Sequence, residues 1–161
     1  MKLVIGSDKS GFTLKERIKQ YLLEQGIAFE EVGTADPELG VPFYLVAPQA
    51  AKRVQTGAAD MGILVCGTGM GMSQVANKYR GIRAACVESV YGAKMCRAVN
   101  DSNILCMGGW LIAPELGLEM VRTFLATGHT QDLEAWRQKF LLDAKEAFAQ
   151  LENTIYGGAQ A

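Results

Sequence analysis

The sequence has few of the residues that build metal centres. It contains one histidine, His129, and its four cysteines include no CxxC pair. Zinc sites draw on several such ligands at characteristic spacings. We therefore expect no metal site, and we expect the cysteines to be free thiols, as in a reducing cytosol.

An excess of charge of one sign and a long apolar run are also missing. The chain has 16 Lys and Arg residues against 17 Asp and Glu residues, for a formal net charge of -1. No bulk field therefore attracts nucleic acid or an anionic membrane. The first apolar run, residues 3–5, is too short for a secretory signal, and no later stretch approaches the length of a membrane span. These features predict a cytoplasmic protein without nucleic-acid or membrane partners.

Short apolar runs alternate along the chain with longer segments of helical periodicity. The pattern predicts strands over 3–5, 27–33, 61–67, 83–87 and 104–109, and helices over 12–26, 44–56, 72–79, 89–100, 114–128 and 131–152. Such alternation is typical of a parallel sheet covered on both faces. We expect a three-layer, doubly wound, Rossmann-like α/β fold with a five-stranded parallel sheet and a long C-terminal helix. A single domain would span 1–155, with a flexible tail over 156–161.

The stretch ILVCGTGMGMS, residues 63–73, ends a buried strand at Cys66 and continues into a glycine-rich turn. The carboxyl ends of strands in such sheets are where ligands bind. The turn contains neither a complete GxGxxG nor the GK[ST] of a P-loop, so we expect no dinucleotide and no other cofactor. Its backbone N–H groups can instead bind a small anion and lower the pKa of a neighbouring thiol.

This combination suits a proton transfer next to a carbonyl group. Such a reaction needs a base beside the reacting carbon and fixed donors where negative charge develops on oxygen. Cys66 is a candidate base, and Thr68 together with the loop amides could supply the donors. The residues alone fit a tight turn that carries a buried thiol equally well.

Three stretches carry a resemblance to a known family. They are IGSDKSGFTLKERIKQYL at 5–22, ADMGILVCGTGMGMSQVANKYRGIRAA at 59–85 and MCRAVNDSNILCMGG at 95–109. The chain resembles the ribose-5-phosphate isomerase B and galactose-6-phosphate isomerase family, the cysteine-using aldose–ketose isomerases. The resemblance spans most of the chain, and its central stretch is highly specific.

The resemblance implies a role for each matching residue. Cys66 matches the cysteine that moves a proton between C1 and C2, and Asp8 matches an acid at the sugar hydroxyls. Further residues are expected to bind substrate or the enediolate: Gly67, Thr68, Gly69, Met70 and Gly71 in the central loop, Lys9 and Ser10 in the first loop, and Asn100 and Arg137. The family also implies a homodimer or a dimer of dimers, with sites at the subunit interface and no metal.

The chain departs from the family pattern at several positions. Lys9 stands where many ribose-phosphate isomerases have a histidine, and Val99 replaces the histidine that opens the sugar ring. A valine can neither donate nor accept a proton. Of the family's aspartate, tyrosine and proline segment only Pro42 remains, and the C-terminal pair of phosphate-binding arginines is represented by Leu133 and Arg137.

These departures leave several substrates open. A tetrose 4-phosphate, which we favour, cannot close a five-membered ring and needs no ring-opening group. The chain could also be one subunit of a heteromeric galactose-6-phosphate-type isomerase, with a second homologous subunit as partner. A sugar acid, an unphosphorylated sugar, ordinary ribose 5-phosphate turnover and a non-catalytic sugar-phosphate-binding paralogue remain as alternatives.

Two structural expectations concern residues outside the central loop. Arg83 is expected to pair with an acidic side chain. The last helix has a wide apolar face, formed by Leu133, Trp136, Phe140, Leu141, Ala144, Phe148 and Leu151. This face predicts packing on a partner subunit or on the helix's own domain.

Overall fold

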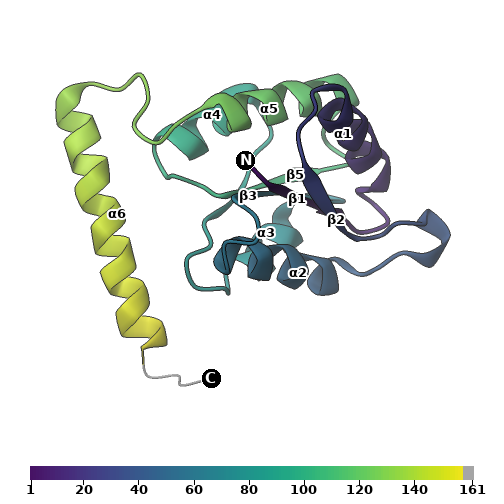
Figure 1. Ribbon diagram of the computed structural model, residues 1–161, viewed down its shortest axis with the longest axis horizontal. Coiled ribbons are helices and arrows are strands. Elements are labelled where there is room, and N and C mark those ends of the chain that lie inside the picture. The colour runs from purple at the N-terminus through teal and green to yellow at the C-terminus, as the bar shows by residue number, and fades with distance from the viewer. Residues whose placement is uncertain (158–161) are drawn as a thin grey trace.

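The computed structural model describes residues 1–157, in which strands and helices alternate. In chain order the elements are β1 (Leu3–Ser7), α1 (Phe12–Glu24), β2 (Phe29–Gly33), the short 3-10 helix η1 (Pro37–Leu39), α2 (Phe43–Gln55), β3 (Met61–Cys66), α3 (Met70–Ala76), β4 (Ala84–Cys86), α4 (Val90–Ala98), β5 (Ile104–Gly108), α5 (Pro114–Ala126) and α6 (Ala135–Tyr156). Figure 1 shows their arrangement.

The sheet has the order β2-β1-β3-β5-β4, and every neighbouring pair is parallel. Helices α1, α4 and α5 cover one face and α2 and α3 cover the other (Figure 1). Two apolar clusters fill the space between the sheet and these layers. β1 and β5 are buried along their whole length, as expected for strands covered on both sides. The predicted three-layer, doubly wound fold is confirmed.

The last helix differs from its prediction in position and in packing. It begins at Ala135 rather than at 131 and continues to Tyr156. Thr130 and Asp132 have positive φ values of 63° and 57°, so the chain turns at these residues before the helix starts. The predicted tail over 156–161 falls mostly outside the described residues, and Tyr156 itself belongs to the helix.

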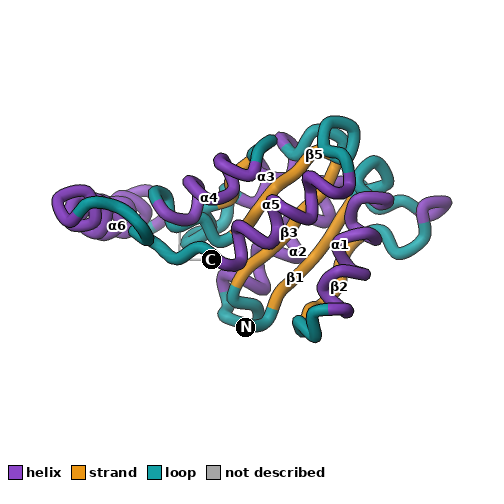
Figure 2. Tube along the Cα trace, turned by 90° about the horizontal axis from the view of Figure 1, so that it is seen from above, coloured by secondary structure: helices purple, strands orange, loops and turns teal. Residues whose placement is uncertain are grey.

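Helix α6 stands beside the three layers instead of covering the sheet (Figure 2). In this helix, all of which the structure describes, Leu141 alone is buried. The other large apolar side chains along it are exposed: Trp136, Phe140, Leu142, Phe148, Leu151 and Ile155. The apolar face predicted from the sequence is therefore largely uncovered in a single chain.

The strand order determines where a site can form. From β1 the chain enters α1 on one face of the sheet, and from the adjacent β3 it enters α3 on the other face. The two loops diverge above neighbouring strands, which is the arrangement that opens a crevice at the carboxyl edge of a doubly wound sheet. Within residues 1–157, no helix is both long enough and apolar enough to span a membrane.

Candidate active site

Cys66 is the last residue of β3 and lies at the carboxyl edge of the sheet. Its carbonyl oxygen accepts a 2.7 Å hydrogen bond from the N–H of Gly109, which follows the neighbouring strand β5. The side chain is 5% exposed, and its Sγ accepts a 3.2 Å hydrogen bond from the N–H of Gly69. The sulfur is therefore held by the backbone of its own loop.

Gly69 can make this bond because the backbone reverses direction there. Its φ is 79°, in the left-handed region that disfavours side chains. A Cβ at this position would lie 2.9 Å from Cys86 Sγ and 2.9 Å from the backbone carbon of Met107. The turn that directs an N–H group at Cys66 therefore requires glycine.

The rest of the central loop leads into helix α3. The N–H of Met70 donates to the Thr68 side-chain hydroxyl at 3.4 Å, and the Thr68 carbonyl accepts from the Cys86 thiol at 3.5 Å. Met70 and Gly71 open the helix, so their N–H groups lack carbonyl partners within it. The residues after Cys66 thus carry the Thr68 hydroxyl group, which accepts from Met70, and the N–H of Gly71, which has no carbonyl partner within the helix.

The loop after β1 lies against the end of β3. The N–H of Asp8 donates to the carbonyl oxygen of Val65 at 3.3 Å. The carboxylate of Asp8 accepts from the N–H of Gly11 at 3.0 Å. Burial raises the pKa of Asp8, and hydrogen bonds from the backbone of Gly11 and Ser10 only partly oppose this effect. A carboxyl group with a raised pKa is suited to exchanging a proton with a sugar hydroxyl.

Lys9 projects from the same loop. It is exposed, and its side chain passes close to Gly40, which ends η1 and precedes α2. Its backbone follows Asp8 at the carboxyl edge of the sheet, and its side chain lies against the segment that leads into α2.

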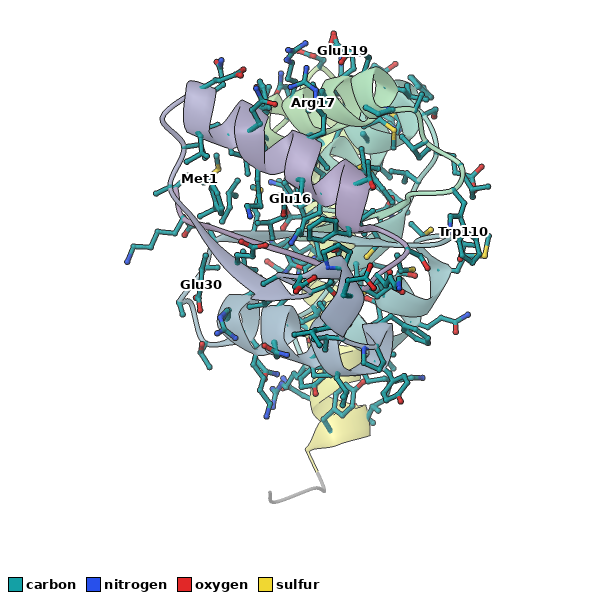
Figure 3. All side chains as sticks on the ribbon, turned by 90° about the vertical axis from the view of Figure 1, so that its right-hand side faces the viewer. Met1, Glu16, Arg17, Glu30, Trp110 and Glu119 are labelled. Carbon is teal, nitrogen blue, oxygen red and sulfur yellow. The ribbon has the colours of Figure 1, made fainter. Side chains whose placement is uncertain are left out.

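A residue that the sequence reasoning missed, Trp110, also borders the crevice. Its N–H donates to the Gly67 carbonyl oxygen at 3.1 Å, and its indole lies over Gly67. Figure 3 shows its side chain at the molecular surface, at the level of the sheet. The sequence did contain a signal for it. A glycine pair ends the fifth strand just before Trp110, and parallel strands end at one common edge, so Trp110 could have been expected near Cys66.

Two of the predicted binding residues lie elsewhere in the single chain. Asn100 follows α4 and lies near the amino ends of β4 and β5, whereas Cys66 lies at their carboxyl edge. The amino and carboxyl ends of β5 are separated by the length of this strand, roughly 16 Å at 3.3 Å per residue. Arg137 lies in the first turn of α6, beside the body of the protein. One chain therefore brings together Asp8, Lys9, Ser10 and the residues from Cys66 to Gly71, but neither Asn100 nor Arg137.

A cluster of charged side chains surrounds Asp101 near Asn100. The Asp101 carboxylate forms ion pairs with Arg83 at 3.0 Å, Arg97 at 2.9 Å and Lys145 of α6 at 2.6 Å. Burial alone would raise the pKa of Asp101, but the three cations together lower it below its usual value. The predicted pairing of Arg83 with an acid is confirmed, and Lys145 ties α6 to the body.

A groove of about 610 Å³ separates α6 from the rest of the chain at this cluster. Polar side chains from the body, including Asn100 and His129, face apolar side chains of α6, including Phe140 and Phe148. The pKa of His129 is lowered, mainly by burial and against the attraction of Asp101.

Comparison with known proteins assigns the chain to a family. The model of the family described as Ribose/Galactose Isomerase matches residues 3–139. The chain belongs to this family. It is 56% identical to a 4-deoxy-4-sulfo-D-erythrose isomerase from Clostridium sp. strain MSTE9, over 97% of this chain and 98% of that protein. It is 35% identical to D-erythrulose-4-phosphate isomerase 2 from Mycolicibacterium smegmatis, over 78% of this chain and 84% of that protein.

The solved structure of ribose-5-phosphate isomerase B from Clostridium thermocellum has the same fold. It superimposes with a TM-score of 0.85 over 96% of this chain and 99% of that one, at 34% identity. The predicted family and the predicted aldose–ketose isomerase activity are therefore confirmed, with relatives that act on sugars other than ribose phosphate.

Proposed function

We propose that this member of the ribose/galactose isomerase family interconverts 4-deoxy-4-sulfo-D-erythrose and the corresponding ketose. The observation that carries the proposal is the 56% identity with the 4-deoxy-4-sulfo-D-erythrose isomerase, which extends over 97% of the chain. The chemistry of the departures from the family pattern supports the same substrate.

Val99 is the first such departure. A sugar that carries a sulfonate on C4 has no C4 hydroxyl, so it cannot close a five-membered ring. The open-chain aldehyde then needs no group to open it. A side chain without a transferable proton at position 99 is compatible with this substrate and unsuited to a cyclic pentose.

The second departure from the family pattern concerns the positive charge available to bind the terminal anion of the sugar. A sulfonate carries one negative charge, whereas a phosphate monoester carries about 1.5 to 2 at neutral pH. The C-terminal segment offers Arg137 and has Leu133 where the family has a second arginine. Fewer cations are needed to balance the smaller charge. A tetrose 4-phosphate is the second candidate, supported by the 35% identity with an erythrulose-4-phosphate isomerase.

In the mechanism we propose, the thiolate of Cys66 removes the proton from C2 of the aldose. The C2–H electrons form the double bond of an enediolate, and negative charge moves to O1. The hydroxyl group of Thr68 and the N–H of Gly71 at the start of α3 stabilise that charge. Cys66 then returns a proton to C1, and Asp8 assists the accompanying transfer between O2 and O1, giving the ketose. The reaction is redox-neutral and uses no cofactor.

The complete site in this proposal needs two copies of the chain. Asn100 and Arg137 lie away from Cys66 in one chain, and a second copy could supply both. The exposed apolar side chains of α6 support such an assembly, because their burial against another subunit would be favourable. We place the enzyme in the cytoplasm, where four free cysteines are the ordinary state.

Proton NMR in deuterated water tests the proposal. The purified chain is incubated separately with 4-deoxy-4-sulfo-D-erythrose, D-erythrose 4-phosphate and D-ribose 5-phosphate. We expect the C2–H signal of the sulfonate sugar to be lost and its ketose to appear, at a higher kcat/KM than with either phosphate. Faster turnover of ribose 5-phosphate would contradict the proposed substrate, and no turnover of any sugar would contradict isomerisation by this chain alone.

A further inference from the structure

We propose that Trp110 is a specificity-determining residue, whose indole forms one wall of the substrate site beside Cys66 and limits the length of the carbon chain. This inference rests on the proposed function, because it requires the sugar to react at Cys66.

The backbone of Trp110 is attached to the residues that follow β3. Gly108 at the end of β5 pairs in register with Cys66. The next N–H, of Gly109, donates to the Cys66 carbonyl at 2.7 Å, and the N–H of Trp110 donates to the Gly67 carbonyl at 3.1 Å. These two consecutive hydrogen bonds therefore fix the position of the Trp110 backbone relative to Cys66.

The indole occupies the space directly over Gly67. Three of its ring carbons, Cζ3, Cε3 and Cη2, lie 2.8 to 2.9 Å from the point where a Cβ on Gly67 would be. Any side chain at position 67 would displace the ring. Gly67 is buried, while 71% of the Trp110 surface is exposed. One part of the ring thus covers the residue next to Cys66, and most of the rest is open to a ligand.

The loop after β1 meets the residue that precedes Trp110. A Cβ on Gly109 would lie 2.7 Å from the carbonyl oxygen of Ser10 and 3.1 Å from Cα of Gly11. A Cβ on Gly11 would in turn lie 2.9 Å from the backbone nitrogen of Cys66. The first loop and the indole therefore border the same strand end, and a sugar that reacts at Cys66 has the indole on one of its sides.

The chemistry of the indole suits a wall and not an anion site. Its single polar group is the N–H donor, and it carries no charge. Its apolar surface can pack against the C–H groups of a sugar and exclude water from the enediolate. Each additional carbon in the substrate would have to be accommodated against this ring, so the wall favours short chains.

Steady-state kinetics with Trp110→Ala tests the inference. The measured quantity is the ratio of kcat/KM for D-ribulose 5-phosphate to kcat/KM for D-erythrulose 4-phosphate in the reverse reaction. These two ketoses end in the same anion, and neither needs a ring to be opened. We expect Trp110→Ala to raise this ratio by about tenfold or more, the range in which a pocket discriminates one methylene. Trp110→Phe retains a ring and should leave the ratio within about threefold of the unmodified protein.

The control is Leu23→Ala, because Leu23 is an apolar side chain that is 68% exposed and lies near the C-terminal end of α1, away from Cys66. Leu23→Ala should leave the ratio unchanged. The chain has two tryptophans, Trp110 and Trp136. In a Trp136→Phe background the tryptophan fluorescence comes from Trp110, and saturating 4-deoxy-4-sulfo-D-erythrose should change its emission.

The outcomes separate the two proposals. An unchanged ratio in Trp110→Ala, or an equal loss with both sugars, would overturn the specificity role while the unmodified protein still isomerises four-carbon sugars. If the unmodified protein turns over no four-carbon sugar, the proposed function fails. The fluorescence titration, repeated with ribose 5-phosphate, then decides whether Trp110 borders the ligand, and unchanged emission with every sugar would overturn its place in the site.

Discussion

The N–H of Gly69 donates a hydrogen bond to Sγ of Cys66 at 3.2 Å. The contact fixes the position of the sulfur relative to its loop. The left-handed turn at Gly69 therefore positions the atom that takes up the proton in the proposed mechanism.

Cys66→Ala should abolish turnover and leave ligand affinity within about tenfold, or about 1.4 kcal/mol, because the change removes the base and not the binding groups. Turnover is measured by NMR and affinity by isothermal titration calorimetry. Cys96→Ala is the control, since burial raises the pKa of Cys96 to about 11 and it lies on α4. Full activity in Cys66→Ala would show that another group moves the proton.

Gly69→Ala should lower the free energy of unfolding by about 3 kcal/mol, the sum of left-handed strain and overpacking against Cys86 and Met107. Urea denaturation measures the change. Gly57 has a similar φ of 75°, but a Cβ there would have no heavy atom within 4 Å. Gly57→Ala should therefore cost only the strain, about 1 kcal/mol. Equal costs at both positions would show that the close contacts at Gly69 relax freely.

Much of the fold and part of the site could be predicted from the sequence. Apolar runs and glycine-rich turns place Cys66 and Asp8 at strand ends, and parallel strands bring such ends to one edge. Trp110 was missed because its contact with Gly67 depends on β5 lying beside β3, and chain order does not reveal that neighbour. The packing of α6 could not be predicted either. A helix that packs on its own domain and one that packs on a partner have the same apolar periodicity.

Cys66→Ala and Arg137→Ala should each be inactive alone and active when mixed, if a site combines Cys66 of one copy with Arg137 of another. Unfolding and refolding equal amounts together should restore about a quarter of the activity, because half of randomly assorted dimers hold one intact site of two. The mixture of Cys66→Ala with Asp8→Ala is the matched control. Both of these residues belong to the same half of the site, so no intact site can form. Equal recovery in the two mixtures, or none in either, would contradict a shared site.

Asp101→Asn should destabilise the protein by about 2 kcal/mol at neutral pH, because it removes the charge that holds Arg83, Arg97 and Lys145 together. Asparagine tolerates the positive φ of 46° at this position, so the backbone is not the cause. The ion pairs lower the pKa of Asp101 below its unfolded value of 3.8. Their contribution is therefore complete above that pH and is lost as the pH falls through the lower, folded pKa.

The same substitution gives a pH signature that urea denaturation can measure. The stability difference between the unmodified protein and Asp101→Asn should be largest near about pH 7 and should shrink below about pH 4. Asp143→Asn removes an exposed pair with Lys139 on α6 and should change stability by at most about 0.5 kcal/mol. A cost at Asp101 no larger than at Asp143, or one independent of pH, would show that the cluster does not anchor α6 through its charge.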